Sequence, residues 1–341
     1  MMILKHHPDY ISPGETRTMK AIRIESFGGP EVMNYVDVDL AAPGAGEVRI
    51  RHTQIGLNFI DTYHRSGLYP VPLPSGLGLE ACGVVEELGQ GVEHLAIGDR
   101  VAYGAGPIGA YAQARNIAAG RVSKLPDAID DETAAAIMLK GMTVRYLLRE
   151  TYYVKAGDTI VFHAVAGGVG QIAVQWANVL GATVIGTVGS PEKAEIAKSL
   201  GCHHVINYST ENVVERVREL TDGKGVPVVY DGVGKDTFET SLDCLQPLGL
   251  MVSFGNASGP VTGFDLGVLA TKGSLYVTRP MLMAYVASDD ALQANASDLF
   301  DVVGSGKVKI SVNQHYPLAD AAQAHKDIAA RKTTGSTVLT V

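Results

Sequence analysis

The sequence of 341 residues is poor in cysteine and contains no long apolar run. Its three cysteines are odd in number and lie far apart, at Cys82, Cys202 and Cys244. Such a spacing forms neither a disulfide framework nor a metal site, so we expect small core residues in a reducing, cytoplasmic compartment. No apolar run approaches the ~20 residues of a membrane-spanning helix, so no membrane span is expected.

Positive charge is also scarce. The chain has 28 Lys and Arg residues against 36 Asp and Glu residues, which gives a net charge of -8. A protein that binds nucleic acid or an anionic membrane through its overall field needs the opposite balance. We therefore expect no nucleic-acid partner, and a nucleic-acid-binding or structural role is the least favoured class.

The chain is long enough for about two domains of ~150 residues each. Residues 1–18 are polar and without periodicity, and we expect a disordered leader there. A first strand-like run begins at Met19. From there to about Asp127, short alternating runs are separated by glycines, which is typical of a compact, partly closed β-domain. Asp130 is then a suitable N-cap for a helix.

From Gly157 to about Tyr276 the pattern changes to alternating strands and helices. This alternation predicts an α/β domain with a doubly wound parallel sheet. The expected strands cover residues 159–163, 183–187, 204–206, 227–230, 250–254 and 274–277. The expected helices include residues 191–200 and 211–221. After Asp289 we expect a helix over residues 291–304 and short strands over 308–310 and 337–339.

One stretch organises this second half. An apolar, β-branched run over residues 159–162 passes through a glycine-rich turn into an apolar helical stripe that ends near Gly181. Small residues recur at Ala164, Gly167 and Gly170, where backbone N–H groups and a helix N-terminus can approach a pyrophosphate. A ligand-free turn would look the same, but the strand–helix–strand context favours a dinucleotide. The candidate binding residues are Ala166, Gly167, Gly168, Val169 and Gly170.

The second strand of this unit carries the information on cofactor choice. A fold that prefers NAD usually places a carboxylate at the tip of this strand, to bind the ribose 2′-OH. Here the tip holds Ser190, followed by Lys193, and Tyr208 can flank the same pocket. A hydroxyl and a cation favour the 2′-phosphate of NADPH. The alternative is an ordinary polar first turn of a helix.

Glycine-containing turns also follow two later strands of the expected sheet. Parallel strands place their carboxyl ends at one edge, where ligands bind in open α/β sheets. The sequence therefore predicts an extended nucleotide groove. Its further candidate residues are Gly232, Val233, Gly234, Phe254, Gly255 and Ser258.

Four motifs, over residues 55–70, 73–80, 164–170 and 253–259, resemble the quinone oxidoreductases of the medium-chain dehydrogenase/reductase superfamily, including the relatives of zeta-crystallin. The resemblance implies a GroES-like catalytic domain and a Rossmann domain that binds NADPH. It implies a homodimer joined through the Rossmann sheets and a quinone as substrate. The same cleft and cofactor would also serve an activated alkene, such as an enone or enoyl thioester. The resulting domain limits are residues 19–140 with 290–341, and 141–289.

The chain departs from the zinc alcohol dehydrogenases of this superfamily at two positions. Their catalytic zinc uses a cysteine where this chain has Asn58 and a histidine where it has Leu79. Neither residue can replace a thiolate or an imidazole on zinc. Asp61 and Glu80 remain, but two carboxylates alone are weak support for a metal site. We therefore expect a zinc-free enzyme.

The resemblance also implies roles for residues outside the glycine turns. Asn58, Tyr63 and Tyr69 would line the nicotinamide and substrate side of the cleft, where their donors could polarise a quinone oxygen. Ordinary half-buried packing is the alternative for the tyrosines. Further expected site residues are Lys140 and Thr143 at the cleft floor, Arg279 as a cation, and Arg331 near the cofactor.

Other polar side chains are expected to have structural roles. For Arg331 and its neighbour Lys332, a solvated charged turn is as good an explanation as a cofactor contact. His163 lies in a strand of the nucleotide domain and is expected to be structural rather than catalytic. The remaining histidines have no metal-binding spacing and are expected at the surface: His94, His203, His204, His315 and His325.

Overall fold

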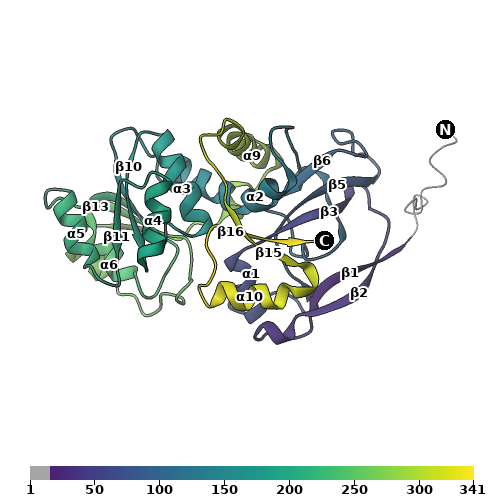
Figure 1. Ribbon diagram of the computed structural model, residues 1–341, viewed down its shortest axis with the longest axis horizontal. Helices are drawn as coiled ribbons and strands as arrows, with labels where there is room; N and C mark the ends of the chain where they lie inside the picture. Colours follow the sequence, from purple (N-terminus) through teal and green to yellow (C-terminus); the bar gives the residue numbers. More distant parts are fainter. Residues whose placement is uncertain (1–15) are drawn as a thin grey trace. The chain divides into compact units, whose positions relative to one another are not determined.

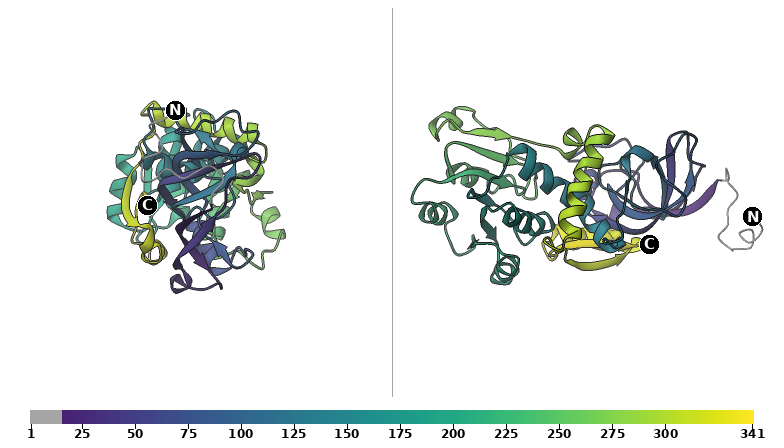
Figure 2. Two further views of the ribbon diagram at one scale, coloured as in Figure 1. Left: turned by 90° about the vertical axis from the view of Figure 1, so that its right-hand side faces the viewer. Right: turned by 90° about the horizontal axis from the view of Figure 1, so that it is seen from above.

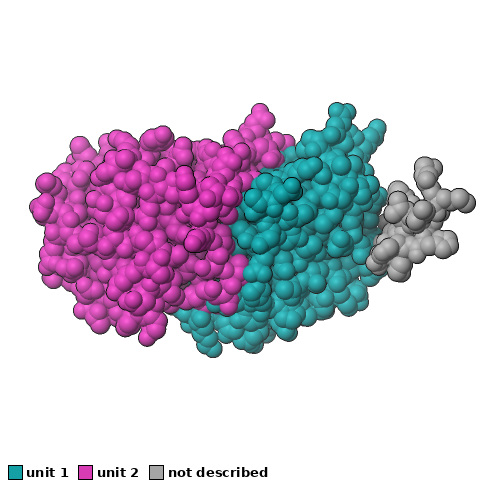
Figure 3. Space-filling view, turned by 45° about the horizontal axis from the view of Figure 1, so that its top comes forward, with its two compact units in different colours: residues 1–139, 314–332, 337–341 teal, residues 140–313, 333–336 magenta. Residues whose placement is uncertain are grey.

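The structure is a computed structural model that describes residues 16–341, which form two units (Figure 3). Unit 1 contains the chain up to Leu139 together with residues 314–332 and 337–341, and unit 2 contains residues 140–313 and 333–336. The first strand begins at Arg17, slightly before the expected start at Met19. Most of the expected leader, residues 1–15, lies outside the described residues.

The last part of the chain leaves unit 2 later than the sequence predicts. Helix α9 (Asp289–Gly304) packs within unit 2, against the second half of α2 (Asp131–Tyr146). The amide of Asn295 donates to the Met142 carbonyl at 3.3 Å, and Arg145 pairs with Asp298 at 2.9 Å. The expected boundary at residue 290 is therefore wrong, and the chain returns to unit 1 only at residue 314. The strand expected over 308–310 is instead β15 (Val312–Pro317).

Unit 2 is built on a six-stranded parallel sheet (Figure 1). The order β11-β10-β9-β12-β13-β14 is the 3-2-1-4-5-6 order of a dinucleotide-binding fold, which confirms the doubly wound sheet predicted from the alternating pattern. Its strands are β9 (Thr159–Phe162), β10 (Thr183–Val188), β11 (His204–Asn207), β12 (Val226–Asp231), β13 (Leu245–Ser253) and β14 (Tyr276–Thr278).

Apolar residues cover both faces of this sheet, as a buried parallel sheet requires. On one face, β9, β10 and β12 pack side chains such as Ile185 and Val229 against Val217 of α5 (Val213–Leu220) and Leu242 of α6 (Phe238–Asp243). On the other face, the hydroxyl of Tyr230 donates to the Leu147 carbonyl at 3.1 Å. Figures 1 and 2 show helices around the strands. The helices of unit 2 are α3 (Gly168–Val179), α4 (Pro191–Ser199), α5 (Val213–Leu220), α6 (Phe238–Asp243), α7 (Gly267–Thr271), α8 (Leu282–Tyr285), α9 and the π-helical turn Leu147–Thr151.

Unit 1 is the predicted β-rich domain. A seven-stranded sheet has the order β15-β16-β3-β5-β6-β8, with β7 paired to β3, and a three-stranded sheet has the order β2-β1-β4. Alternate residues such as Val48, Ile50 and Val85 form its core. The strands are β1 (Arg17–Ile24), β2 (Asn34–Leu40), β3 (Glu47–Leu57), β4 (Ser75–Gly76), β5 (Glu80–Leu88), β6 (Arg100–Tyr103), β7 (Ala114–Ala118), β8 (Ser123–Lys124), β15 and β16 (Ser336–Thr340). The helices are α1 (Phe59–Ser66), α10 (Ala321–Ala329) and three single 3₁₀ turns at 30–32, 119–121 and 318–320.

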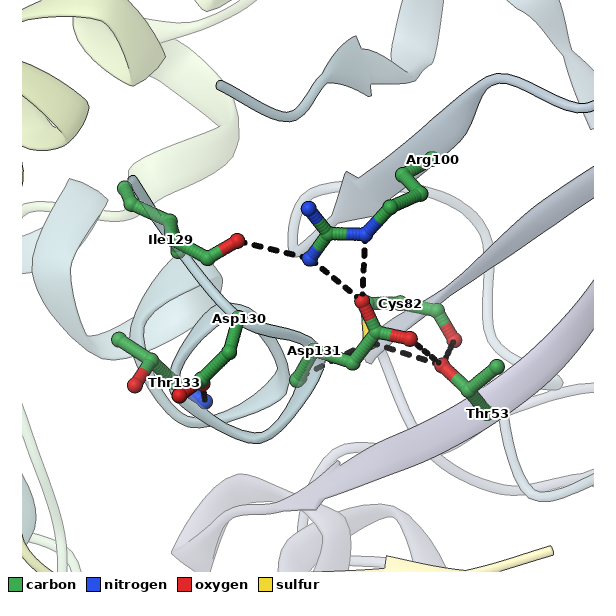
Figure 4. Close-up of polar contacts among 7 residues, drawn as sticks. All are labelled: Thr53, Cys82, Arg100, Ile129, Asp130, Asp131 and Thr133. Carbon is green, nitrogen blue, oxygen red and sulfur yellow. Dashed lines mark hydrogen bonds and ion pairs between the residues drawn. The ribbon is translucent and has the colours of Figure 1, made fainter. Parts of the chain in front are cut away.

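Helix α2 is fixed at its start by a polar cluster (Figure 4). Asp130 accepts the Thr133 N–H at 2.7 Å, so it is the predicted N-cap. The Asp131 carboxylate accepts from the Thr53 hydroxyl at 2.7 Å and from two nitrogens of Arg100 at 2.6 and 2.9 Å. This paired carboxylate fixes the first turn of α2, the helix that carries Lys140 further along.

The three cysteines are small, buried core residues, as the sequence predicts. Burial raises the pKa of the Cys82 thiol to about 12, so it stays protonated at neutral pH. Over residues 16–341, no helix is both long and apolar enough to cross a membrane.

Candidate dinucleotide and substrate sites

The turn between β9 and α3 has the geometry of a pyrophosphate-binding turn. Ala164 has a left-handed backbone (φ 56°), and its carbonyl accepts the Gly167 N–H at 3.0 Å. Gly167 is the extended N-cap of α3, a helix of 12 residues. A Cβ at Gly170 would lie only 2.5 Å from the Ala164 carbonyl oxygen, so the helix can approach the strand only because this residue is glycine. The first N–H groups of α3 therefore form a small, positively polarised donor site.

Two other segments of unit 2 lie beside this turn. A Cβ at Gly168 would lie 2.9 Å from the Lys140 side chain and 3.0 Å from the Gly335 carbonyl oxygen. The Gly335 N–H donates to the Ala166 carbonyl at 3.3 Å. Lys140, expected from the family resemblance, is thus next to the glycine turn. Gly335 was missed, and its only signal in the sequence is a glycine near the C-terminus.

The tip of β10 brings together the three residues proposed to recognise the 2′-phosphate. Ser190 is the N-cap of α4, and its hydroxyl oxygen accepts the Lys193 N–H at 3.3 Å. A hydrogen bond with Ser190 lowers the pKa of the Glu192 carboxyl. A Cβ at Gly189 would overlap the hydroxyl of Tyr208, whose side chain is 49% exposed. Ser190 therefore has the capping role of an ordinary first turn, on the same small surface as Lys193 and Tyr208.

The turns after β12 and β13 pack directly against each other. The Asp231 carboxylate accepts the N–H groups of Val233 at 2.8 Å and Gly234 at 3.0 Å. A Cβ at Gly255 would overlap the Gly232 carbonyl. The Ser258 hydroxyl donates to the Val233 carbonyl at 2.9 Å. Phe254 completes the group, since its ring lies 2.9 Å from the position of a Cβ on Gly232.

Three further predicted residues belong to segments outside these turns. Arg279 follows β14, and its guanidinium donates to the Ser253 carbonyl at 2.7 Å, at the carboxyl end of β13. Thr143 lies half-buried on α2. Arg331 is exposed, belongs to unit 1 and has a left-handed backbone (φ 59°) directly after α10. Its N–H donates to the Ile328 carbonyl at 3.1 Å.

In unit 1, Asn58 is buried at the N-terminus of α1 and its amide is fixed by a carboxylate. The Asn58 Nδ2 donates to Glu80 Oε2 at 2.7 Å, and Glu80 Oε1 accepts the Leu139 N–H at 2.8 Å. A Cβ at Gly56 would overlap Glu80, so glycine makes room for the carboxylate. Because an ionised carboxylate only accepts, the NH₂ end of the Asn58 amide must face Glu80.

Tyr63 and Tyr69 form an aromatic cluster with Phe59. The rings of Tyr63 and Tyr69 meet edge to face, with centroids 5.1 Å apart, and Phe59 lies 5.5 Å from Tyr63. The Tyr69 N–H donates to the Tyr63 carbonyl at 3.2 Å. Tyr63 is buried and Tyr69 is half-buried, so both rings pack against neighbouring aromatic side chains, as the alternative of ordinary packing expects.

The two carboxylates next to Asn58 and Leu79 in the fold or the sequence, Asp61 and Glu80, have protein partners. Glu80 contacts Asn58 and Leu139, as described above. Asp61 accepts the Asn58 N–H at 2.9 Å and the Tyr111 hydroxyl at 2.9 Å. Among residues 16–341, no three His, Cys, Asp or Glu side chains form a group that could hold a metal ion.

The expectation that His325 lies at the surface is wrong. His325 is fully buried on α10, with its Nε2 3.1 Å from the Tyr111 hydroxyl and its Nδ1 3.2 Å from Arg65. Burial, and then the Arg65 charge, lower its pKa to about 3. Helical spacing from Ala321 and Ala324 was the available signal, because all three face the core. The other four histidines expected at the surface are exposed: His94, His203, His204 and His315.

The 3-2-1-4-5-6 sheet with its glycine turn, joined to a β-rich unit, defines a dinucleotide-dependent dehydrogenase or reductase. Residues 44–128 match the family model of the alcohol dehydrogenase GroES-like domain, and residues 168–294 match that of the zinc-binding dehydrogenases. The chain is 59% identical to a quinone oxidoreductase of Pseudomonas aeruginosa over 321 residues, which is 94% of this chain and 99% of the relative. It thus belongs to the quinone oxidoreductases of the medium-chain dehydrogenase/reductase superfamily.

Two further relatives are informative about ligands. The crystal structure of Escherichia coli quinone oxidoreductase complexed with NADPH superposes with a TM-score of 0.93 at 52% identity, and covers 94% of this chain and 100% of that one. A 2-haloacrylate reductase from a Burkholderia species is 49% identical over 93% of this chain and 97% of its own length.

Proposed function

We propose that this protein is a zinc-independent quinone reductase that uses NADPH. The observation that carries the proposal is the set of turns at the carboxyl edge of the unit 2 sheet. They supply the N-terminus of α3 for a pyrophosphate and Ser190, Lys193 and Tyr208, without a carboxylate at the strand tip, for a 2′-phosphate. The near full-length similarity to quinone oxidoreductases, one of them complexed with NADPH, supports the same assignment.

The residues of unit 2 fit this cofactor. A Cβ at Gly168 would collide with the Lys140 side chain and a Cβ at Gly170 with the Ala164 carbonyl, so the close packing of this turn around the α3 N-terminus requires glycine. Bound NADPH supplies the hydride, and the protein supplies orientation and electrostatics. The turns 166–170, 232–234 and 254–258 bind and align the nucleotide, together with Lys140 and Thr143. Arg279 places a cation at the carboxyl end of β13, and Arg331 is a second candidate cation.

The residues of unit 1 act on the quinone. The Asn58 Nδ2 carries two hydrogens, of which Glu80 accepts one. The second is donated to a quinone oxygen, and this bond strengthens as negative charge develops on that oxygen. Tyr63 and Tyr69, whose rings pack edge to face, are proposed to supply an aromatic wall for the flat quinone ring. No metal is needed for this step, because the amide donor takes the place of a Lewis acid.

The protein is further proposed to be a cytoplasmic homodimer. Three free, buried thiols suit a reducing compartment. Strand β14 is the edge of the unit 2 sheet and exposes Tyr276 and Val277. An unpaired apolar edge favours pairing with a second copy about a two-fold axis. Val277→Pro would remove a donor from this edge, so light scattering should then give a monomer where the wild-type protein gives a dimer.

Reduction of an activated alkene is the second candidate function. The 49% identity to a 2-haloacrylate reductase favours it, since that substrate is an alkene conjugated to a carboxylate. The same hydride donor and the same amide donor serve both reactions. The two functions therefore differ only in which acceptor unit 1 binds.

The test is the rate of NADPH and NADH oxidation with 1,4-benzoquinone and, separately, with a simple enone and 2-chloroacrylate. The proposal expects rapid oxidation of NADPH with benzoquinone, slow oxidation of NADH, and weak activity on the alkenes. If only the alkenes are reduced, the substrate is an activated alkene and not a quinone, and the assignment of NADPH as cofactor is unaffected. A preference for NADH would overturn the role of Ser190 and Lys193.

A further inference from the structure

A buried histidine directly precedes the glycine turn after β9 and lies between two hydroxyl groups. His163 directly follows β9 and is 3% exposed. Its Nδ1 is 2.9 Å from the Thr187 hydroxyl, and its Nε2 is 3.0 Å from the Ser241 hydroxyl. The Ser241 hydroxyl in turn donates to Asp231 Oδ2 at 2.7 Å. The sequence predicted only that this histidine is structural.

The chemistry of the groups fixes the direction of each hydrogen bond. The Asp231 carboxylate only accepts, so the single Ser241 hydrogen is donated to it and the Ser241 oxygen must accept from His163 Nε2–H. Burial lowers the pKa of His163 and keeps the ring neutral, so its Nδ1 accepts the Thr187 hydrogen. The Thr187 oxygen then accepts the Ala164 N–H at 3.4 Å. The four side chains form one directed chain with a single tautomer of the histidine.

Both ends of this chain lie on turns assigned above to the cofactor. At one end is Ala164, whose left-handed backbone is one that residues other than glycine rarely adopt and that therefore needs support from its surroundings. At the other end, Asp231 Oδ1 accepts the N–H groups of Val233 and Gly234. The Asp231 carbonyl also accepts the Phe254 N–H at 2.8 Å, which adds the turn after β13.

We propose that Thr187, His163, Ser241 and Asp231 form a positioning chain that sets the spacing of the nucleotide-binding turns across the sheet. No member of the chain has to touch the cofactor. The chain acts by holding the α3 turn and the 232–234 turn in the one relative position that NADPH bridges. This inference rests on the proposed use of NADPH. It extends the set of residues that support NADPH binding to buried residues that do not contact the cofactor.

The test is a double-mutant cycle on NADPH binding, measured by calorimetric titration of the full-length protein. Thr187→Val removes one link and Ser241→Ala removes the link on the other side of His163. Each is expected to raise the Kd for NADPH by about five- to tenfold. The double variant should raise it no more than the stronger single variant, because both changes break the same chain. Thr187→Ser restores the hydroxyl and should bind NADPH like the wild-type protein.

Thr221→Val is the matched control. It removes a threonine hydroxyl that donates to the Val217 carbonyl and accepts the Gly225 N–H, at the end of α5 in the same unit. Its Kd for NADPH should not change. Lower thermal stability of Thr187→Val with an unchanged Kd would overturn the proposal, as would Kd effects of the two changes that simply multiply. Should Thr187→Val not fold, Ser241→Ala with an unchanged Kd would overturn it equally.

The proposed function fails in a different way. If the wild-type protein does not bind NADPH, the cofactor assignment is wrong and the positioning chain falls with it. If the wild-type protein binds NADPH and the substitutions leave the Kd for NADPH unchanged, the positioning chain alone is wrong.

Discussion

Each unit contains one buried histidine that is connected to a buried aspartate through a single hydroxyl. In unit 2 the series is His163, Ser241 and Asp231, and in unit 1 it is His325, Tyr111 and Asp61. In both, the hydroxyl hydrogen goes to the carboxylate, so the histidine Nε2 carries the proton and donates to the hydroxyl oxygen. Both aspartates then hold backbone N–H groups at a candidate site.

The two arrangements differ at the histidine Nδ1. His163 accepts from the neutral Thr187 hydroxyl, whereas His325 faces the guanidinium of Arg65. A nearby cation disfavours a second positive charge, and the lowered pKa of His325 has Arg65 as its second cause after burial. In unit 2 the series ends on the N–H groups of a turn, while in unit 1 it ends on the backbone N–H of Asn58, whose side chain is proposed to contact the substrate. Under the proposed function, the same arrangement supports a cofactor-binding turn in one unit and a substrate-binding side chain in the other.

The largest expected effect is the loss of a carboxylate, and it should be greater in unit 2. Asp231 accepts from Val233, Gly234, Thr237 and Ser241, whereas Asp61 accepts from Asn58 and Tyr111. Asp231→Ala should lower the free energy of unfolding by more than about 4 kcal/mol, and Asp61→Ala by about 2–3 kcal/mol, because each buried donor without an acceptor is costly. Urea unfolding measures both. Equal losses would contradict the comparison.

Removal of the Asn58 amide donor in unit 1 should lower the rate of quinone reduction without changing the nucleotide-binding turns of unit 2. Asn58→Ala is expected to lower kcat/KM for benzoquinone by about 10²-fold, as the loss of one donor to a developing oxyanion does. Glu80→Gln keeps the volume but presents an amide to the amide of Asn58, and should cause a smaller decrease. Stopped-flow kinetics at saturating NADPH measure this. An unchanged kcat/KM in Asn58→Ala would exclude the amide as the polarising donor.

Acid should destabilise the protein through its buried histidines. Burial lowers the pKa of His52 to about 4 and that of His325 to about 3, from an ordinary value of 6.5. As pH falls below about 6.5, the unfolded chain binds protons that the folded chain does not, so stability decreases toward the folded pKa values. Each histidine contributes up to about 1.4 kcal/mol per pH unit in that range. Unfolding at pH 7.5 and 5.5 measures the slope, which His325→Gln should reduce.

The smallest effect concerns cofactor choice. Lys193→Ala should raise the KM for NADPH by about fivefold and leave that for NADH unchanged, because a partly solvated cation contributes modestly to a phosphate contact. Lys198→Ala, in the last turn of the same helix, is the control. Similar changes for both nucleotides in Lys193→Ala would show that Lys193 does not discriminate between them.

Local patterns predicted the elements well but not their long-range partners. The alternating strands and helices, the N-cap Asp130 and the glycine turn are all local, and the structure confirms them. The assignment of α9 failed because its apolar stripe does not reveal which unit it faces. That choice depends on Leu299 filling the space at Gly141 and on Asn295 reaching Met142.

The same reason explains what was missed at the sites. His163 and Ser241 are 78 residues apart, and His325 is 260 residues from Arg65. Gly335 contacts the glycine turn from the far end of the chain. Nothing in their immediate neighbours marks these pairs, since only the folded sheet and helices bring them together. The geometry of the glycine turn after β9 could be predicted because the turn consists of consecutive residues.

We propose that unit 1 activates a quinone with an amide instead of a metal while unit 2 binds NADPH. The most direct measurement is turnover of benzoquinone by protein dialysed against a chelator, with the metal content of the same sample measured by elemental analysis. We expect full NADPH-dependent activity in the metal-free protein. Activity that disappears on dialysis and returns with Zn²⁺ would contradict it.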